Sequence, residues 1–319
     1  MTQTMTDLAL TWAQAGRSVV VATVIETWGS APRGAGSQMV VDGAGAMMGS
    51  VSGGCVEGAV VLEAGEVLQT GKGRLLTYGV SDADAFAVGL ACGGTIRILL
   101  QPVLDLRLLT DLQMRQAALQ PVALVTDLSD LSMRLVGPED AQVAARLASD
   151  QSGIDDGRFI AVYNPPLRLI VVGAVHIAQA LMTMAQLCDY ATVLIDPRTA
   201  FGAEARFPGH DIMTDWPDAA LTHLQPDART AIVTLTHDPK LDDPALISAL
   251  RSPAFYVGCL GSRRTHAKRL ERLTAAGLTA PELQRLHAPV GLHIGARTPA
   301  EIALSVVAQV TAVLRLGRV

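Results

Sequence analysis

Short apolar runs rich in β-branched residues alternate with stretches of helical periodicity throughout the second half of the chain. Four of these runs have the length and composition of buried strands: Leu169–Val172, Thr192–Ile195, Ala231–Leu235 and Phe255–Leu260. Strands that alternate with helices connect through right-handed crossovers, and such crossovers place the strands side by side in a parallel sheet. The chain is therefore expected to be an α/β protein whose C-terminal domain contains a Rossmann-like parallel sheet.

A tripeptide with two prolines, Asn164-Pro165-Pro166, separates this half from the rest of the chain. Residues that precede proline avoid the helical conformation, so the tripeptide is typical of a domain boundary. With 319 residues, half of them apolar, the chain is long enough for about two domains. We expect an N-terminal domain over residues 1–103, a connecting segment over residues 104–166 and the Rossmann-like domain over residues 167–319.

The N-terminal domain is predicted to be a loop-rich, mixed α+β domain, because glycines crowd the region after its first strand. Its expected elements are a helix capped by Thr6 and stopped by Gly16, strands over Ser18–Glu26 and Thr95–Gln101, and a hairpin turn at Asp42-Gly43. In the connecting segment the apolar pattern loosens, and one helix is expected around Glu139–Ala148.

Charge and hydropathy argue against several classes of protein. The net charge is −5, and the only basic clusters are Arg263-Arg264 and Lys268-Arg269, so no nucleic-acid partner is expected. The first residues include Asp7 and several other polar side chains, which break up any signal-peptide core. No apolar stretch is judged to approach the roughly 18 residues of a membrane span, so a cytoplasmic protein without integral membrane association is expected.

The four cysteines, Cys55, Cys92, Cys188 and Cys259, lie far apart and form no C-x-x-C pair. This spacing argues against a structural zinc site or a disulfide framework. Cys188 and Cys259 stand in apolar helix and strand contexts and are expected to be buried. Cys55 and Cys92 each adjoin two glycines, which a core does not need but a ligand or metal close to the backbone does. A helix start after Cys55 would also favour its thiolate.

The first strand of the parallel sheet runs into Gly173, and a helix that begins near His176 follows. In nucleotide-binding folds the amides at such a helix start bind phosphate. Asp196 ends the second strand at about the 20-residue distance of a ribose-binding carboxylate. The full G-x-G-x-x-G motif is absent, because Ala174 and Val175 follow the glycine. The sequence therefore favours a Rossmann scaffold more strongly than it favours tight NAD binding. His176 is either a ligand contact or a polar residue at a helix start.

Two further polar groups follow strands at the carboxyl edge, where ligands bind in open α/β sheets. They are Thr236-His237-Asp238 and Gly261-Ser262-Arg263-Arg264-Thr265. The second group resembles an anion cradle, since it joins a glycine, two hydroxyls and two guanidinium groups at a helix start. The alternative is an N-capped helix with a solvated basic first turn. Arginine at a helix start is unfavourable with the helix dipole, which favours the anion site.

These glycine-rich and charged motifs resemble those of the XdhC/CoxI family in both domains. The N-terminal signature runs from Gly29-Ser30-Ala31-Pro32-Arg33 through Gly53-Gly54-Cys55-Val56-Glu57-Gly58. The C-terminal motifs are Ile195–Arg198, Leu235–Asp238, Tyr256–Thr265, Pro289–Leu292 and Ile294–Ala303. Several long motifs in one order, spread over two domains, make a specific match.

The resemblance implies an accessory protein that binds the molybdenum cofactor, as molybdopterin or its cytosine dinucleotide form. It further implies that a cysteine desulfurase exchanges a molybdenum oxo ligand for sulfur, and that the cofactor is delivered to a xanthine dehydrogenase or carbon monoxide dehydrogenase apoenzyme. We expect a homodimeric chaperone more than a catalyst. The alternative function is an NAD(P)-dependent oxidoreductase with Asp196 on the ribose.

The resemblance also defines the expected cofactor site. Cys55 and Cys92 are expected to act on the molybdenum end as transient metal ligands or sulfur relays, because soft thiolates suit a sulfur-rich centre. The phosphate end is expected near His237 and Arg263–Thr265, across a cleft between the domains. The full set of expected cofactor-binding residues is Ser30, Arg33, Gly53, Gly54, Cys55, Glu57, Gly93, Gly94, Gly173, His176, Asp196, Arg198, His237, Asp238, Gly261, Ser262, Arg263, Arg264, Thr265, Gly291 and Gly295.

Overall fold

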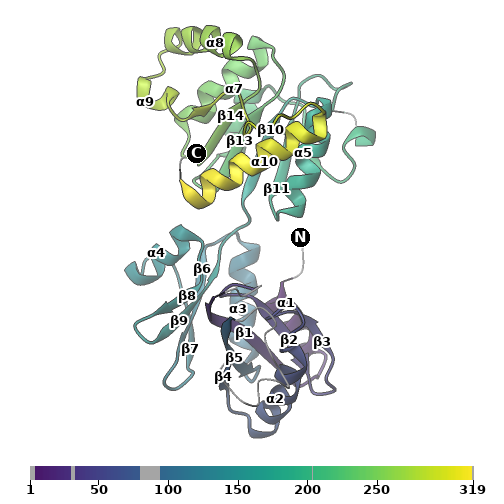
Figure 1. Ribbon diagram of the computed structural model, residues 1–319, viewed down its shortest axis with the longest axis vertical. Coiled ribbons are helices and arrows are strands. Elements are labelled where there is room, and N and C mark those ends of the chain that lie inside the picture. The colour runs from purple at the N-terminus through teal and green to yellow at the C-terminus, as the bar shows by residue number, and fades with distance from the viewer. Residues whose placement is uncertain (1–3, 30–32, 80–93, 203, 318–319) are drawn as a thin grey trace. The chain divides into compact units, whose positions relative to one another are not determined.

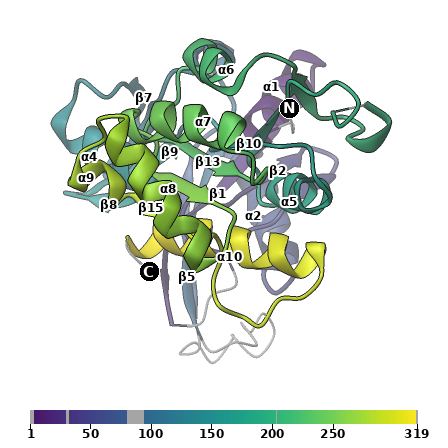
Figure 2. The same ribbon diagram turned by 90° about the horizontal axis from the view of Figure 1, so that it is seen from above.

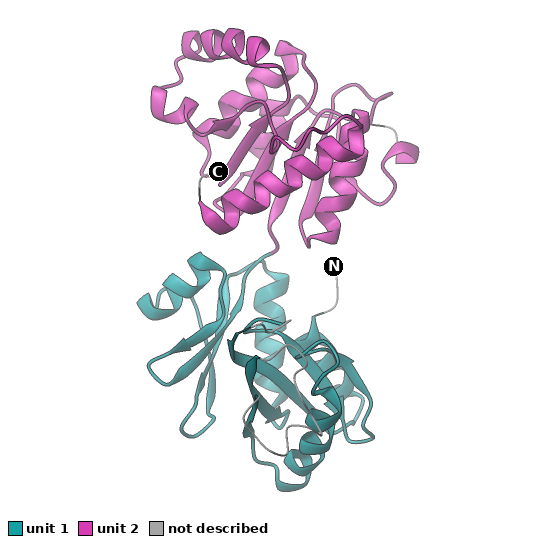
Figure 3. Cartoon of the chain, in the orientation of Figure 1, with its two compact units in different colours: residues 1–165 teal, residues 166–319 magenta. Residues whose placement is uncertain are grey.

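A computed structural model describes residues 4–29, 33–79, 94–202 and 204–317 of the chain. The chain forms two compact units, residues 1–165 and residues 166–319 (Figure 3). The point of division lies within the Asn164-Pro165-Pro166 tripeptide.

Unit 1 begins with an antiparallel sheet of five strands in the order β3-β2-β1-β5-β4. The strands are β1 (Val19–Trp28), β2 (Gln38–Asp42), β3 (Met47–Gly49), β4 (Arg74–Tyr78) and β5 (Thr95–Pro102), and two helices, α1 (Met5–Gln14) and α2 (Glu57–Thr70), accompany them. Apolar residues of α2, such as Val60 and Ala64, pack against one face of β1. Leu10 of α1 packs on the other face of the sheet, against Val19 of β1 and Val40 of β2. The expected hairpin is confirmed by the pairing of β2 with β3.

The first helix is capped two residues earlier than expected. Thr4, not Thr6, is the N-cap, and its hydroxyl accepts a hydrogen bond from the Asp7 amide at 3.1 Å. The Asp7 carboxylate in turn accepts from the Thr4 amide, which completes a capping box. Both threonines suit a cap by type, and the acidic residue three positions on selects Thr4.

Residues 104–165 belong to unit 1, where they form a second antiparallel sheet in the order β7-β6-β9-β8. Its strands are β6 (Val122–Asp127), β7 (Met133–Val136), β8 (Gly153–Asp155) and β9 (Arg158–Tyr163), with helices α3 (Leu106–Ala117) and α4 (Ala141–Ser149). Leu147 of α4 packs on Ala123, Val125 and Ile160 of this sheet. The sequence did not predict this sheet, because its strands are only three to six residues long.

Unit 2 contains a parallel sheet of six strands in the order β12-β11-β10-β13-β14-β15. The strands are β10 (Arg168–Val172), β11 (Ala191–Ile195), β12 (Asp211–Met213), β13 (Thr230–Thr234), β14 (Tyr256–Cys259) and β15 (Leu286–His287). The helices are α5 (His176–Leu187), α6 (Pro217–Leu224), α7 (Pro239–Arg251), α8 (Arg263–Ala275), α9 (Ala280–Leu283) and α10 (Pro299–Leu316). The order reverses between β10 and β13, as in a Rossmann sheet, so the predicted fold class is confirmed. The short edge strands β12 and β15 were not anticipated.

Helices cover both faces of this sheet. Leu169 and Val171 of β10 face the layer that contains α5 and α10, whereas Ile170 and Val172 face the layer that contains α6 and α7. Figures 1 and 2 show α5 and α10 on one side of the strands and α7 on the other. Because both faces are buried, the central strands are continuously apolar. Their carboxyl ends are the edge of the sheet at which polar loops can meet.

Two expectations about apolar segments are wrong. Among the described residues α10 is long and apolar enough to cross a membrane by length and composition, with 18 residues and a mean hydropathy of 1.4. Its Ala303 and Val306 pack into the core of unit 2. Cys188 does not lie on the buried face of α5 but ends that helix in an exposed position. Cys259 is buried as expected, and burial raises the pKa of its thiol to about 12.

Candidate functional site

Polar residues after two neighbouring strands of unit 2 meet at the carboxyl edge of the sheet. After β13, Asp238 caps α7 by accepting a hydrogen bond from the Lys240 amide at 2.9 Å. After β14, Ser262 caps α8 by accepting from the Thr265 amide at 3.1 Å. β13 and β14 are hydrogen-bonded neighbours, so the two helices begin side by side. The two polar groups that the sequence singled out therefore belong to one site.

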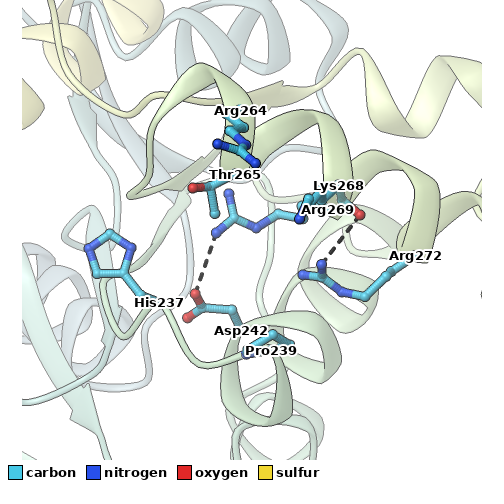
Figure 4. A pocket seen from close by; sticks show the side chains of 8 residues that line it. All are labelled: His237, Pro239, Asp242, Arg264, Thr265, Lys268, Arg269 and Arg272. Atoms are coloured by element: carbon cyan, nitrogen blue, oxygen red, sulfur yellow. Dashed lines mark hydrogen bonds and ion pairs between the residues drawn. The ribbon is translucent and has the colours of Figure 1, made fainter.

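A pocket of about 160 Å³ lies between the starts of these helices. Its lining residues are His237, Pro239, Asp242, Arg264, Thr265, Lys268, Arg269 and Arg272 (Figure 4). Three of them, His237, Arg264 and Thr265, were expected at the site. Arg263 was expected there as well, but it is exposed in the first turn of α8 and does not line the pocket. The other basic residues come from later turns of α8, and Asp242 comes from the first turn of α7.

A buried ion pair lies at the base of the pocket. The Nη2 atom of Arg269 is 3.6 Å from Oδ2 of Asp242, and both side chains are only 2% exposed. Nη2 also donates to the Leu260 carbonyl oxygen at 3.1 Å, and the Thr236 hydroxyl donates to Asp242 Oδ1 at 2.7 Å. Burial raises the pKa of Asp242 above its ordinary value, although the Thr236 hydrogen bond and the Arg269 charge oppose the rise. The pair is thus held in place by residues that follow β13 and β14.

Several donor and acceptor atoms of this ion pair form no hydrogen bond with any residue that the structure describes. Nε and Nη1 of Arg269 and Oδ2 of Asp242 are buried without a hydrogen-bond partner, as is Nδ1 of His266 on the same helix. Most buried polar atoms in folded proteins have at least one partner. Three such atoms in one ion pair mark a buried charged group whose hydrogen bonding the described residues leave incomplete.

The pocket carries excess positive charge. Arg272 of α8 is neutralised by Asp243 of α7, to which it donates two hydrogen bonds. Arg264 and Lys268 have exposed side chains on the rim of the pocket, with no ion pair among the described residues. Asp242 balances the charge of Arg269, so the positive charges of Arg264 and Lys268 at the rim are left unbalanced. Such a pocket favours an anion.

The switch point of the sheet, between β10 and β13, is closed by side chains. A Cβ atom at Gly173, which has φ +112°, would lie 2.6 Å from Cγ2 of Thr236, so this glycine permits close packing of two loops. The Ala174 amide donates to Asp196 at 2.8 Å, and Arg198 binds both oxygens of that carboxylate. Burial alone would raise the pKa of Asp196, but the hydrogen bonds from Arg198 and Ala174 hold it below its ordinary value. The carboxylate expected on a ribose is fully buried and engaged within the chain.

Three other expected residues of unit 2 lie apart from the pocket. His176 is exposed at the first position of α5. Gly291 packs against α10, where a Cβ would come within 2.3 Å of the Ser305 hydroxyl oxygen, and its amide donates to Gln309. Gly295 is exposed with open space around it. Of the two glycines, only Gly291 contacts α10.

In unit 1 the glycine-rich loop before α2 closes on its own carboxylate. Glu57 accepts hydrogen bonds from the backbone amides of residues 51, 52, 53 and 54, and from the hydroxyls of Ser50 and Ser52. The Ser52 hydroxyl accepts from the amides of Cys55 and Val56. Burial acts to raise the pKa of Glu57, but the hydrogen bonds from Ser52 and Ser50 outweigh it and lower the pKa to about 2. The amides at this helix start bind a carboxylate of the chain itself.

Cys55 belongs to the same loop. Its side chain is half-buried and packs against the core of the first sheet, so it is closer to a core than its sequence context indicates. Arg33 is exposed, and Gly94 is buried directly before β5. Ser30, Cys92 and Gly93 lie outside the described residues. Within those residues no group of three or more His, Cys, Asp or Glu side chains is arranged to hold a metal ion, so the metal site expected at Cys55 and Cys92 stays a prediction.

A second cavity, of about 640 Å³, lies wholly within unit 1. Its walls are mainly apolar, with Leu104, Leu108, Leu124 and Leu131 among them, and Gln38 is one of the polar groups. The size is within the range of small-molecule pockets. No motif of the sequence pointed to it, because its lining residues come from segments that lie far apart in the chain.

A six-stranded Rossmann-type sheet with a basic pocket at its carboxyl edge, joined to an antiparallel α+β unit, defines a two-unit ligand-binding protein. Residues 12–79 match the family described as the XdhC and CoxI family, and residues 169–310 match the XdhC Rossmann domain. The chain belongs to the XdhC and CoxI family.

Relatives cover nearly the whole chain. The molybdenum cofactor insertion chaperone PaoD of Escherichia coli (strain K12) is 31% identical over 98% of this chain and 88% of its own length. A probable xanthine dehydrogenase subunit of Bacillus subtilis (strain 168) is 28% identical over 91% of this chain and 92% of its own. A crystal structure described as a xanthine dehydrogenase from Bacillus halodurans superimposes with a TM-score of 0.78 at 29% identity, covering 98% of this chain and 96% of that one.

Proposed function

We propose that this protein binds the molybdenum cofactor as cargo and delivers it to the apoenzyme of a molybdenum hydroxylase. The observation that carries the proposal is the similarity to the insertion chaperone PaoD, which extends over 98% of this chain and includes both units. A cofactor that is carried and released needs binding groups and no catalytic centre. The protein is therefore proposed to be a chaperone and not a catalyst.

The chemistry of the described residues fits such a cargo at both of its ends. The cofactor ends in a phosphate, or in a dinucleotide, and the basic pocket at the start of α8 offers buried guanidinium donors to an anion. At its other end it carries molybdenum with sulfur ligands, for which a thiol such as Cys55 is a suitable soft partner. The first of these groups belongs to unit 2 and the second to unit 1.

A finer part of the proposal concerns sulfur. We infer that the cofactor is sulfurated while it is held here, with a cysteine desulfurase as the donor and Cys55 as the residue that contacts the molybdenum end. The partly exposed thiol at a loop of fixed conformation supports this role. The client is inferred to be of the xanthine dehydrogenase or carbon monoxide dehydrogenase type, and the chain to act as a homodimer.

No observation favours the alternative function as an NAD(P)-dependent oxidoreductase. In that function Asp196 would accept hydrogen bonds from a ribose, and the amides after Gly173 would bind the pyrophosphate. The Ala174 amide and the Arg198 guanidinium already occupy the Asp196 carboxylate. A dinucleotide would have to displace both groups.

The test is pterin analysis of the full-length protein purified from a host that makes the cofactor. Oxidation converts bound pterin to a fluorescent product, and we expect wild-type protein to release it in an amount comparable to the protein itself. Cys55→Ser should release clearly less, whereas Cys188→Ser, which changes an exposed cysteine of unit 2, should match the wild type. Absence of pterin from wild-type protein in such a host would refute the proposed function.

A further inference from the structure

We propose that the pocket at the starts of α7 and α8 is a phosphate-binding site in which Arg269 is the central donor. The ligand class is a phosphate monoester or the terminal phosphate of a diphosphate. Arg264 and Lys268 provide charge at the rim, and Asp242 positions the guanidinium. Only the identity of the natural ligand, the phosphate end of the cofactor, rests on the proposed function; the site itself rests on the geometry.

The first argument is the state of Arg269. This side chain is among the largest that are fully buried, yet Nε and Nη1 donate no hydrogen bond to any described residue. A guanidinium cannot lose its proton in a protein, so burial without partners is not relieved by neutralisation. Asp242 and the Leu260 carbonyl engage only Nη2. Nε and Nη1 point to different sides of the guanidinium and form no fork, so each is left to donate to a separate acceptor.

The second argument is space beside those donors. Gly261, with φ +151°, has no side chain, and a Cβ atom at this position would lie 3.5 Å from Arg269 Nη1 and from Thr265 Cβ. A larger side chain there would crowd Arg269 and Thr265. The pocket volume of about 160 Å³ leaves room for a phosphate group beside Arg269.

The third argument is the balance of charge around the pocket. The ionisable groups that line it are His237, Asp242, Arg264, Lys268, Arg269 and Arg272. Asp242 opposes an anion, but it is paired with Arg269, and Arg272 is paired with Asp243. The charges on Arg264 and Lys268 are then left to attract a ligand, next to the positive end of the α8 dipole. A buried pair with a purely structural role needs neither the free donors nor these rim cations.

The experiment is titration of the full chain, without cofactor, with inorganic phosphate and with pyrophosphate by calorimetry at fixed ionic strength. We expect saturable binding that weakens by about 10-fold or more in Arg264→Gln/Lys268→Gln, since each substitution removes a charge-assisted contact. The single variant Arg264→Gln should weaken binding as well, and its matched control is Arg263→Gln, which removes one charge from the same helix turn but does not line the pocket. It should change the affinity by less than about 2-fold.

A further variant tests the central residue. Arg269→Lys keeps the charge beside Asp242 but removes the planar donors, so it should abolish saturable binding while the circular dichroism spectrum stays unchanged. Equal weakening by Arg263→Gln and Arg264→Gln, or no saturable binding to either anion, would overturn the site. If Arg269→Lys does not fold, the two rim substitutions decide the question.

The outcomes separate this inference from the proposed function. Pterin that copurifies with a wild-type protein unable to bind phosphate or pyrophosphate would refute the phosphate site and leave the chaperone function standing. Saturable phosphate binding by a protein that never carries pterin would support the site and refute the chaperone function.

Discussion

Each unit of this protein contains a helix with a buried charged side chain close to the glycine- and serine-containing loop that precedes the helix. At α2 the charge is Glu57, and the amides and hydroxyls of the preceding loop converge on it. At α8 the charge is Arg269, two turns into the helix, and several of its donors have no partner among the described residues. Similar sequence patterns therefore give one site that is satisfied by the chain and one that is open to a ligand.

Whether the hydrogen bonds of the buried charge are complete separates a structural role from a binding role in such loops. A buried charge whose hydrogen bonds are complete stabilises the fold and has little left to offer a ligand. A buried charge with free donors is costly in the unbound protein and is retained where a ligand completes it. Substitutions of Arg269 and of Glu57, each with a control substitution, therefore test whether the two charges differ in this way.

The largest effect is expected from Arg269→Met, which leaves Asp242 buried without its partner. We expect the free energy of unfolding of unit 2 to fall by about 3–5 kcal/mol, the usual cost of breaking a buried pair. The measurement is denaturant unfolding followed by the fluorescence of Trp216, in a background where the tryptophans of unit 1, Trp12 and Trp28, are replaced by phenylalanine.

The matched control for that prediction is the double variant Arg269→Met/Asp242→Leu. Replacing both charges by apolar groups of similar size should recover most of the lost stability, because no charge is left unpaired. Phosphate binding should remain lost. A double variant as unstable as Arg269→Met would show that the pair stabilises the fold by itself, and the contrast with Glu57 would disappear.

A somewhat smaller effect is expected from Glu57→Ala in unit 1. Several backbone amides would lose their acceptor, at a cost of about 2–4 kcal/mol in the free energy of unfolding. Fluorescence of Trp12 and Trp28 in a Trp216→Phe background reports on this unit. Glu66→Ala, on the same helix but exposed, should cost less than about 0.5 kcal/mol. Equal losses in both variants would contradict the role assigned to Glu57.

The pH dependence of stability should carry the signature of Glu57. Its pKa is lowered from 4.5 to about 2 in the folded protein, so folding favours the carboxylate. The stabilisation is fully present above about pH 4.5 and is lost as the pH falls toward 2. Wild-type protein should therefore exceed Glu57→Gln in stability by a constant amount between about pH 7 and pH 5.5, and by progressively less below that. A difference that stays constant down to about pH 3 would rule out the lowered pKa.

The smallest effect on stability is expected from Cys55→Ser. The side chain is half-buried at the edge of the first core, so the loss should stay below about 1 kcal/mol. Chemical denaturation of the purified variant measures it. A larger loss would mean that reduced pterin retention in this variant reflects a damaged unit 1, and the thiol would then need to be tested by alkylation instead.

Much of unit 2 was predictable because its physical requirements are local. Alternating apolar strands and helices specify a parallel sheet, and all four expected strands are present within one or two residues. Asp238 followed by proline, and Ser262, are likewise local signals of a helix start. The sheet within residues 104–165 was missed because its short strands are stabilised by pairing with one another, which depends on residues far apart in the chain.

The candidate site was predictable only in part, for a similar reason. The sequence draws attention to Arg263 and Arg264, which are adjacent, but of the two only Arg264 lines the pocket. Arg269 and Asp242 carry no motif and are separated by 27 positions, so nothing in the sequence pairs them. A signal that was available is helical spacing, since Arg264 and Lys268 lie about one turn apart on one face of α8.

The alternating architecture of unit 2, the hairpin between β2 and β3, and the motifs that identify the family are all encoded locally in the sequence. These follow from local periodicity, turn chemistry and similarity, none of which requires knowledge of distant contacts. Only the tertiary structure decided that Glu57 is enclosed by its own loop and that Arg269 keeps free donors. Whether a buried charge is satisfied depends on every atom within hydrogen-bonding distance of it, and those atoms are brought together only when the chain has folded.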